Sequence, residues 1–362
     1  MIAELYKKAY RIYGKISSRR SLNRYYKRIL RGGIVIKKLS KEQKKEIQDY
    51  YRSVIGRDVN TKWHELIYSM SGVFNKKYLP FEQYDDVIFS MSPWYLQKVL
   101  DDKNTYRYLL KDFHLPERFL ECSYGIYRLP QKGDIEVNID EASEYLANID
   151  SCIIKPSKDS SSGNKVSLFQ TNNVVVVDDG RTVKEFLKSY GSHFVVEKKV
   201  IENENLQRLN PSSCNTLRIH TARINGQVHF LTAFIRIGKK GSAVDNGNKG
   251  GICVGLEPSG KIMGETACLL SPYRHVQYTD SGIDLNDYKI EGLDRIIDTC
   301  ISAHHVFPYF DLIGWDMCID ENDNVVIIEF NPNPDMRLDQ LFFFDTCLGQ
   351  YQEDILKQIY RK

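Results

Sequence analysis

Three oxygen-bearing side chains interrupt two short apolar runs near the C-terminal end of the sequence. The runs 314–319 and 325–331 flank the turn residues 320–324, and this pattern predicts an antiparallel hairpin. Asp316 lies in the first run, whereas Glu329 and Asn331 lie in the second, where strand alternation puts them on one face. Because a lone carboxylate in an apolar strand is costly to desolvate, these acids need a partner. Two carboxylates and an amide oxygen suit Mg²⁺, so the hairpin is a candidate metal site; a surface hairpin with incidental acids is the alternative.

A lysine closes an earlier apolar strand and is followed by a loop of small residues. Lys155 ends the run 152–155, and the loop contains Ser160, Ser161, Ser162 and Gly163. Backbone N–H groups of such a loop and a nearby ammonium can bind a polyphosphate. The spacing is not that of a Walker loop, and taken alone the segment is more typical of a flexible connection. Lys155 at the end of a buried strand favours an anion-binding role, because a lysine there needs an anion.

The run His193 to Lys199 begins as an apolar strand and ends in charged residues. Val196, Glu197 and Lys198 could present backbone groups to the edge of an adenine ring, and Glu204 follows seven residues after Glu197. A plain edge strand would show the same pattern, so this segment gains weight only beside the others.

Two arginines lie in strand-like, apolar surroundings. Arg218 is within the run 216–223, and Arg236 is within the run 228–237. An arginine in such a place usually pairs its planar guanidinium with a carboxylate or a phosphate. The two arginines are therefore candidates for phosphate binding, and structural salt bridges are the alternative.

The elements that must position these side chains alternate along the chain from about residue 100. We predict a polar helix over 101–113, helices over 141–148, 182–190 and 293–303, and strands over the runs 151–155, 174–177, 193–199, 216–223, 228–237, 315–319 and 325–330. Such alternation is typical of an α/β or α+β body. Residues 1–100 are predicted to be mainly helical, with a helix start at Ser40 and a single strand signal at 34–36.

The composition is that of a folded globular chain. The chain has 362 residues, of which 42% are hydrophobic and 27% charged, which excludes disorder of the whole chain. No apolar run is long enough for a membrane span, and the first residues lack a secretion signal. The eight cysteines are scattered without a Cys-x-x-Cys pair, so we expect reduced thiols and a cytoplasmic location.

The net charge of +3 conceals two regions of opposite sign. Residues 1–62 carry 18 Lys or Arg and 5 Asp or Glu, whereas the other 300 residues carry 32 and 42. We refer to residues 1–62 as the basic head. It could be a solvated helical face, it could rest on an anionic membrane surface, or it could bind nucleic acid, for which no known motif is present.

In chain order the candidates are Lys103, Lys155 with its loop, Glu197, Arg218, Arg236, Asp316, Glu329 and Asn331. This ordered set resembles the ATP-grasp superfamily, and within it the sugar-transfer-associated group found with polysaccharide biosynthesis, such as that of capsule or O-antigen. The closer resemblance covers about two-thirds of the chain, from about residue 77 to 335, and rests on the phrases Lys77-Tyr78-Leu79-Pro80, Asp102-Lys103-Asn104, Asn215-Thr216-Leu217-Arg218, Val244-Asp245-Asn246, Gly250-Gly251-Ile252 and Gly314-Trp315-Asp316.

The resemblance implies an α/β (α+β) ATP-grasp fold in which two α+β subdomains clamp ATP. We expect the basic helical region over 1–100, a subdomain with the phosphate loop and hinge over 101–198, and a catalytic subdomain with the Mg²⁺ site over 199–362. The implied roles are phosphate binding by Lys103 and Lys155 under the loop 160–164, an adenine-facing hinge at Val196, Glu197 and Lys198, ribose binding by Glu204, two Mg²⁺ ions at Asp316, Glu329 and Asn331, and charge neutralisation by Arg218 and Arg236.

Two features depart from the family pattern. Many members carry a strand-rich domain where this chain has its basic helical region. The glycine that usually follows the metal-binding asparagine is replaced by Pro332, so Asn333 competes with Asn331 as the predicted metal ligand.

The resemblance also implies a reaction: ATP phosphorylates a carboxylate, and an amine then displaces phosphate to form an amide. By family analogy the acid is a uronic-acid sugar or similar, and the amine an amino acid or other amine. The loop around Asp245, Asn246 and 249–251 could lie over the acceptor. His220, His229, His275, His304 and His305 are candidate bases, although each is more often a structural histidine.

Two other functions remain open at this stage. The same fold could phosphorylate a sugar or another small molecule. Alternatively, the chain could be a non-catalytic basic module that docks on a membrane or on nucleic acid.

Overall fold

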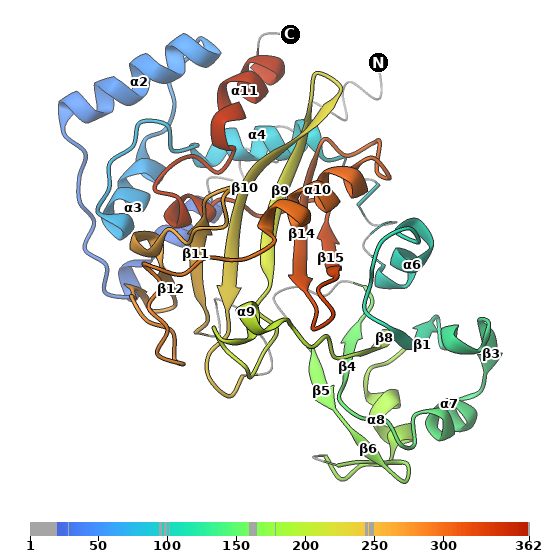
Figure 1. Ribbon diagram of the computed structural model, residues 1–362. Helices are drawn as coiled ribbons and strands as arrows, with labels where there is room; N and C mark the ends of the chain where they lie inside the picture. Colours follow the sequence, from blue (N-terminus) through green and yellow to red (C-terminus); the bar gives the residue numbers. More distant parts are fainter. Residues whose placement is uncertain are drawn as a thin grey trace.

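Two antiparallel sheets dominate the computed structural model, which describes residues 20–27, 29–93, 96–97, 100, 102–158, 165–177, 179–242, 245 and 250–360 (Figure 1). Within these residues the larger sheet has the strand order β13-β12-β11-β10-β9-β14-β15, and the smaller one has the order β3-β2-β1-β8-β4-β5. The predicted mixture of α and β structure is confirmed.

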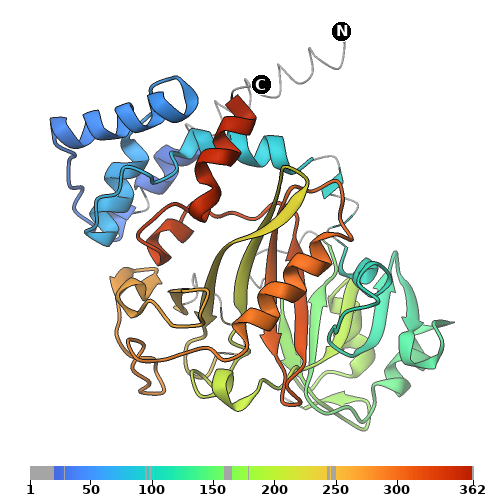
Figure 2. The same cartoon turned by 45° about the horizontal axis from the view of Figure 1, so that its top comes forward.

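The larger sheet holds the main core. Trp315 and Phe330 pack with Ile219 and Ile235 on one face, which helix α10 (Leu293–His304) covers (Figure 2). The left-handed Gly292 precedes this helix. The strands are β9 (Leu217–Ile224), β10 (Gln227–Ile237), β11 (Ile252–Leu256), β12 (Cys268–Leu270), β13 (Tyr273–His275), β14 (Leu312–Ile319) and β15 (Val325–Asn331).

The smaller sheet forms a second body with its own core around Leu120, Ile154 and Phe194. Its strands are β1 (Arg118–Ser123), β2 (Ile126–Leu129), β3 (Ile135–Val137), β4 (Cys152–Pro156), β5 (Ser167–Phe169) and β8 (His193–Lys198), with the hairpin β6 (Thr171–Asn172) and β7 (Val175–Val176) beside it. Helices α7 (Ile139–Tyr145) and α8 (Val183–Ser189) pack against it, each begun by a capping box.

The described part of the N-terminal region is helical, as predicted. Residues 20–27 and 29–31 are helical, and α2 (Lys41–Ile55), α3 (Lys62–Ser71) and α4 (Phe81–Met91) follow. The predicted start at Ser40 is confirmed, because Ser40 and Gln43 form a capping box. The strand signal at 34–36 is wrong, since these residues form no strand. The predicted pattern over residues 2–16 lies outside the described residues.

The helix predicted over 101–113 is much shorter in the structure. Residue 101 lies outside the described residues, the Asp102 carboxylate accepts the Asn104 N–H, and a short 3₁₀ helix η1 (Lys103–Thr105) leads into α6 (Tyr106–Leu109). The remaining short elements are η2 (Pro130–Lys132), α9 (Glu204–Gln207), η4 (Gly264–Thr266), η5 (Asp339–Phe342) and η6 (Gly349–Tyr351). Among the described residues no helix is long and apolar enough to cross a membrane.

The N-terminal helices pack on one end of the larger sheet, together with the C-terminal helix α11 (Gln352–Tyr360) (Figures 1 and 2). Tyr51 of α2, Leu356 of α11 and Leu231 of β10 belong to one buried cluster. The segment between α3 and α4 is held by side-chain amides, because Gln340 bonds both backbone groups of Leu79 and Gln352 bonds the Lys77 carbonyl. The helical region is thus joined to the chain that follows β15.

Replacing Gln340 by leucine should destabilise the protein by about 2–4 kcal/mol, because the buried Leu79 N–H would lose its acceptor. Urea unfolding of the variant measures this change. The exposed Gln227 provides the control, and its replacement by leucine should change the free energy of unfolding by less than about 0.5 kcal/mol. Equal stability of the two variants would contradict the assigned role of Gln340.

Candidate active site

Four charged side chains form a row across four neighbouring strands of the larger sheet. Arg218 on β9 is opposite Asp316 on β14, and Asp316 is in turn opposite Glu329 on β15. Directly opposed residues share a face, so these three side chains lie on the face away from α10. Arg236 on β10 joins them, because its Nη2 atom lies 2.9 Å from Asp316 Oδ2. We call Arg236, Arg218, Asp316 and Glu329 the charged row.

Asp316 is the buried centre of this row. Its Oδ2 atom accepts a hydrogen bond of 3.1 Å from Arg218 Nη2, and its side chain is only 8% exposed. Burial alone would raise the pKa of Asp316, but the two guanidinium charges outweigh it and lower that pKa to about 2. Asp316 therefore stays ionised throughout the physiological range, as a metal ligand must.

The predicted metal ligands fit a hard cation. Asp316 and Glu329 are cross-strand neighbours, and Asn331 lies two residues beyond Glu329 on the same face. The buried Nδ2 atom of Asn331 has no hydrogen-bond partner among the described residues. A metal ion would bind the Oδ1 atom of the same side-chain amide. Asn333 is exposed and donates instead to Gln97 over 3.4 Å. No cluster of three His, Cys, Asp or Glu suited to a metal occurs in the described chain, so Asn331 would complete the ligand set.

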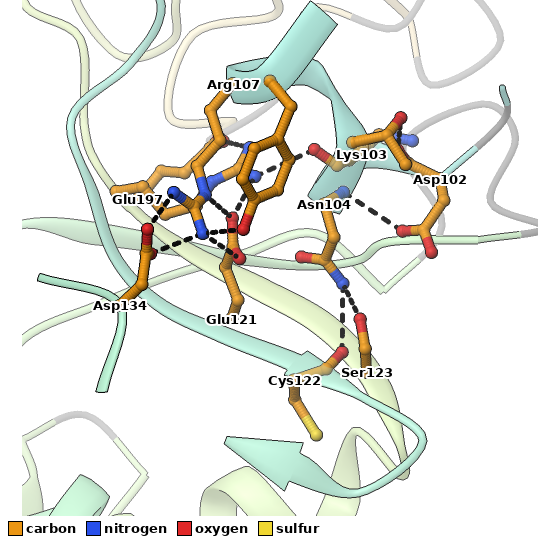
Figure 3. Close-up of polar contacts among 12 residues, drawn as sticks. Asp102, Lys103, Asn104, Arg107, Glu121, Cys122, Ser123, Asp134 and Glu197 are labelled. Atoms are coloured by element: carbon orange, nitrogen blue, oxygen red, sulfur yellow. Dashed lines mark hydrogen bonds and ion pairs between the residues drawn. The ribbon is translucent and has the colours of Figure 1, made fainter. Parts of the chain in front are cut away.

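Lys103 connects the charged row to the smaller sheet. Its Nζ atom lies 3.1 Å from Glu329 Oε1, and its backbone N–H donates to the Ser157 carbonyl over 2.9 Å. The Lys103 carbonyl accepts a bond of 2.8 Å from Arg118. Asp102, Lys103 and Asn104 lie together beside β1 in Figure 3. The predicted phosphate-binding lysine is therefore buried where both sheets approach it.

Lys155 lies on β4 and points at Glu197 on β8. Lys155 Nζ is 2.7 Å from one Glu197 oxygen, and Arg118 Nη2 is 2.6 Å from the other. Burial alone would raise the pKa of Glu197, yet the charges of Lys155 and Arg118 together lower it to about 2. The Glu197 carboxylate is thus engaged in positioning Lys155. Because β8 lies between β1 and β4, it is not an edge strand, and the backbone of Val196 and Glu197 pairs with both neighbouring strands.

Further ion pairs extend this network outward. Arg118 contacts Glu121 over 2.8 Å, and Glu121 contacts Arg107 over 2.7 Å (Figure 3). Arg107 also forms an ion pair with the exposed Asp134, so the network of ion pairs extends to the surface. Sequence reasoning missed Arg118 and Glu121, although both are charged residues within the strand-like stretch 118–123 and could have been noticed for that reason.

Two linkers, residues 114–117 and 199–203, connect the smaller sheet to the rest of the chain and run beside the β14–β15 turn. His114 accepts a backbone bond from Ile327, and Ile201 accepts one from Glu321. A cleft of about 170 Å³ lies between the linkers and the turn, and Lys198 is among its lining residues. Val196 is buried in the core of the smaller sheet, whereas Glu204 is exposed at the start of α9.

Glu202 and Asn215 anchor the second linker to the start of β9, and sequence reasoning missed both as a pair. The Glu202 carboxylate accepts bonds of 2.7 and 3.0 Å from the Asn215 backbone and side chain. Burial raises the pKa of Glu202 to about 8 despite these bonds. Asn215 belongs to one of the sequence phrases that carried the family resemblance, and the structure gives it this anchoring contact.

The other candidates are distributed as follows. Ser160, Ser161, Ser162, Gly163 and Asn246 lie outside the described residues. Asp245 accepts the Thr216 N–H over 3.0 Å and lies 3.5 Å from Arg236. Of the five histidines, His220 lies two residues from Arg218 on the face of the charged row, whereas His229 packs on Tyr351 and His275 contacts Tyr273. His304 is buried on the α10 side, where burial lowers its pKa to about 4, and His305 follows α10 as its C-cap.

Comparison with protein families gives one match, over residues 83–348, to the model described as sugar-transfer associated ATP-grasp. The chain belongs to this family. The mixed α and β architecture with its two sheets is thus an ATP-grasp fold. No curated protein matches the chain.

Several solved structures are similar over part of their length. They include ATP-grasp ligase PsnB with a precursor peptide and AMPPNP (12% identity, 72% of this chain and 59% of that one, TM-score 0.40), L-amino acid ligase from Bacillus licheniformis (11%, 77% and 50%, 0.37) and D-alanyl-alanine synthetase A from Vibrio cholerae (15%, 74% and 64%, 0.41). The chain spans less than two-thirds of the length of each.

The low pKa of Glu197 predicts a stability loss in acid. A carboxyl whose folded pKa lies below its unfolded value stabilises the fold above the unfolded pKa, here about 4.5, and this contribution is lost as pH falls toward about 2. For Glu197 the full contribution is about 3 kcal/mol. Urea unfolding of the wild type between pH 6 and 3 should show this loss.

The variant Glu197→Gln tests the assignment. Below pH 4.5 its free energy of unfolding should depend less steeply on pH than that of the wild type, because about one proton fewer is taken up on unfolding. The exposed Glu141 provides the control, and Glu141→Gln should keep the slope of the wild type. An unchanged slope in Glu197→Gln would show that this carboxyl does not carry the effect.

Proposed function

We propose that this ATP-grasp protein is an ATP-dependent carboxylate–amine ligase that forms an amide through an acyl phosphate. The observation that carries the proposal is the charged row, with Lys103 reaching it from the smaller sheet. Phosphoryl transfer needs positioned charges more than covalent help from the protein, and this arrangement holds cations from both sheets beside paired carboxylates.

The proposed role of each residue follows from its position in the site. Lys155, fixed by Glu197, and Lys103 are proposed to bind the phosphates of ATP, with residues 160–163 beside them. Arg218 and Arg236 are proposed to neutralise the transferred phosphoryl group and the oxyanion that follows. Val196, Glu197 and Lys198 are proposed to lie beside the adenine, and Glu204 is proposed to bind the ribose.

Asp316, Glu329 and Asn331 are proposed to hold Mg²⁺, of which two ions are expected. The bound metal would supply charge neutralisation between the phosphates. To bind it, Glu329 must exchange its contact with Lys103, and Asp316 must share its oxygens with the two arginines. Both changes are local rotations of side chains that already lie on one face.

The substrate proposed for the acid is a carboxylated sugar, such as a uronic acid, and the proposed amine is an amino acid or a related amine. The family description, which ties the fold to sugar transfer, supports this choice. The proposed setting is polysaccharide biosynthesis at a cytoplasmic site. Nucleic acid is not expected as a partner.

A panel assay tests the function. ADP release is measured with D-glucuronate, D-galacturonate and their nucleotide-linked forms, each with and without amino acids, and products are identified by mass spectrometry. We expect an amide product that requires both acid and amine. A stable phosphorylated alcohol would instead indicate a kinase, and the absence of ATP binding would indicate a non-catalytic module; either result overturns the proposal.

The variant Glu329→Gln should lower kcat in this assay on the order of 100-fold or more, because a charged ligand and the partner of Lys103 are lost. Glu321 lies on the same hairpin, at its exposed turn, and Glu321→Gln is the matched control with unchanged turnover. Equal activity of both variants would contradict the assigned metal site.

For the basic head we propose peripheral contact with an anionic membrane surface. The cations Lys41 and Lys45 are exposed on α2. Positive charges near an anionic surface each contribute about 1 kcal/mol to binding, and salt weakens the attraction.

Vesicle sedimentation tests this contact. The wild type should bind vesicles containing phosphatidylserine but not pure phosphatidylcholine, and the double variant Lys41→Glu/Lys45→Glu should bind several-fold less. The double variant Lys132→Glu/Lys188→Glu makes the same change of charge at exposed sites near the smaller sheet and should bind like the wild type. Binding that is insensitive to salt or equal in both variants would refute the proposal.

A further inference from the structure

A carboxyl and an imidazole face each other in the larger body without a hydrogen bond between them. Asp339 opens η5 and is 5% exposed, and His220 on β9 is fully buried. His220 Nε2 lies 3.7 Å from Asp339 Oδ2, which is too long for a hydrogen bond. Within the described residues His220 Nε2 has no hydrogen-bond partner, and no hydrogen bond to the Asp339 carboxyl is found. Buried polar groups in this state need an explanation.

The pair lies directly beside the charged row. His220 follows Arg218 by two residues on the same strand and therefore shares its face. His220 is opposite Gly314 on β14, and Gly314 is opposite Asn331 on β15. A side chain at Gly314 would lie 2.9 Å from Pro334 and 3.3 Å from the His220 ring, so the segment after β15 folds closely over this glycine. This fold-back carries Asp339 to the charged row.

Asp339 differs from the other carboxylates of the site in its partner. Asp316 is held by two arginines, Asp245 lies beside Arg236, and Glu329 lies beside Lys103. Asp339 faces an imidazole that burial keeps neutral, because burial lowers the pKa of His220 well below its ordinary value. The hydroxyl of Thr232 lies 3.1 Å from His220 Nδ1 and can donate to it, which leaves the Nε2–H directed at Asp339.

The charges around Asp339 leave its proton exchangeable near neutral pH. Burial raises the pKa of Asp339 to about 8; Arg218 and Arg236 oppose this rise, and Asp335 adds to it. The titratable and charged groups that face it are His220 and Arg218 on β9, Arg236 on β10, Cys253 on β11, and Asp335 and Cys347 on the following segments. A base is most effective when its pKa lies near the working pH.

We propose that Asp339 is the general base that accepts the proton of the attacking amine. The proposal rests on the ligase function proposed above. In this step the lone pair of the amine nitrogen forms the C–N bond, and the bond between the acyl carbon and the phosphate oxygen breaks, with its electron pair leaving on phosphate. The proton released by the nitrogen passes to the ionised Asp339 carboxylate and then to solvent. The arginines of the charged row lie beside the leaving phosphate, and Asp339 lies next to them on the same face.

Two nucleophiles with different needs for a base test this role. With ATP and D-glucuronate, hydroxylamine captures an acyl phosphate without help, because its nitrogen is already unprotonated at neutral pH, whereas glycine must lose a proton. Asp339→Asn should keep hydroxamate formation within about threefold of the wild type and lower amide formation from glycine about 100-fold or more. The control Asp354→Asn makes the same isosteric change at an exposed position of α11 and should preserve both rates.

The possible outcomes separate the two proposals. Equal losses with both nucleophiles, or no loss with either, would overturn the role of Asp339 as a base. Failure of the wild type with both nucleophiles would instead count against the ligase function with this acid.

A second variant keeps the test decisive if Asp339→Asn folds poorly. Asp339→Ala should lose amide formation from glycine to a similar degree. Added formate should enter the vacated space and raise this rate at least tenfold. Absence of rescue in a folded variant, checked by circular dichroism, would overturn the proposal. Infrared difference spectra between the wild type and Asp339→Asn should also show a carboxylic acid that ionises near pH 8; using the difference removes the contribution of Glu202, which titrates in the same range.

Discussion

The compensation of buried charge across four antiparallel strands is the constraint on which the site depends. Asp316 is buried, and an isolated carboxylate there would be too costly to ionise. Arg218 on the neighbouring strand β9 and Arg236 on the next strand, β10, lower this cost. The registers of β9, β14 and β15 set the spacing of the charged row. The opposite face of the same strands supplies the apolar core under α10. Along each strand, residues that face the core therefore alternate with residues on the face of the charged row.

In the smaller sheet a separate network of ion pairs compensates the buried charges. Lys155, Glu197, Arg118 and Glu121 alternate in sign from the interior toward the surface. Removing one member of such a network leaves a buried charge unpaired, which destabilises the fold, whereas a complete network fixes the positions of its side chains. Lys103 then links the two networks, because it contacts Glu329 of one sheet while its backbone is bonded to the other. The cations proposed for phosphate binding are thereby held in place by the fold itself.

Much of the architecture could be predicted from local patterns. The hairpin carrying Asp316 and Glu329, the capping box at Ser40 and the strand ending in Lys155 all depend on neighbours within a few residues, and the structure confirms these elements. The long helix expected over 101–113 failed because the Asp102 side chain and the packing of Lys103 favour a tight turn.

The contacts that could not be predicted join distant segments. Arg118 reaches Glu197 across 79 positions, and Asp339 reaches His220 through a fold-back of the chain. No local period encodes such a contact. The roles of the individual site residues remain predictions.

The glycine at position 314 has a consequence for how this site can vary in evolution. Its lack of a side chain lets Pro334 approach the sheet, and the same approach brings the following segment, with Asp339, to the charged row. The position of strand β14 and that of the carboxyl at 339 are therefore coupled through the absence of a side chain at Gly314. A larger residue at 314 would displace both Pro334 and the ring of His220, and with them the contact between His220 and Asp339.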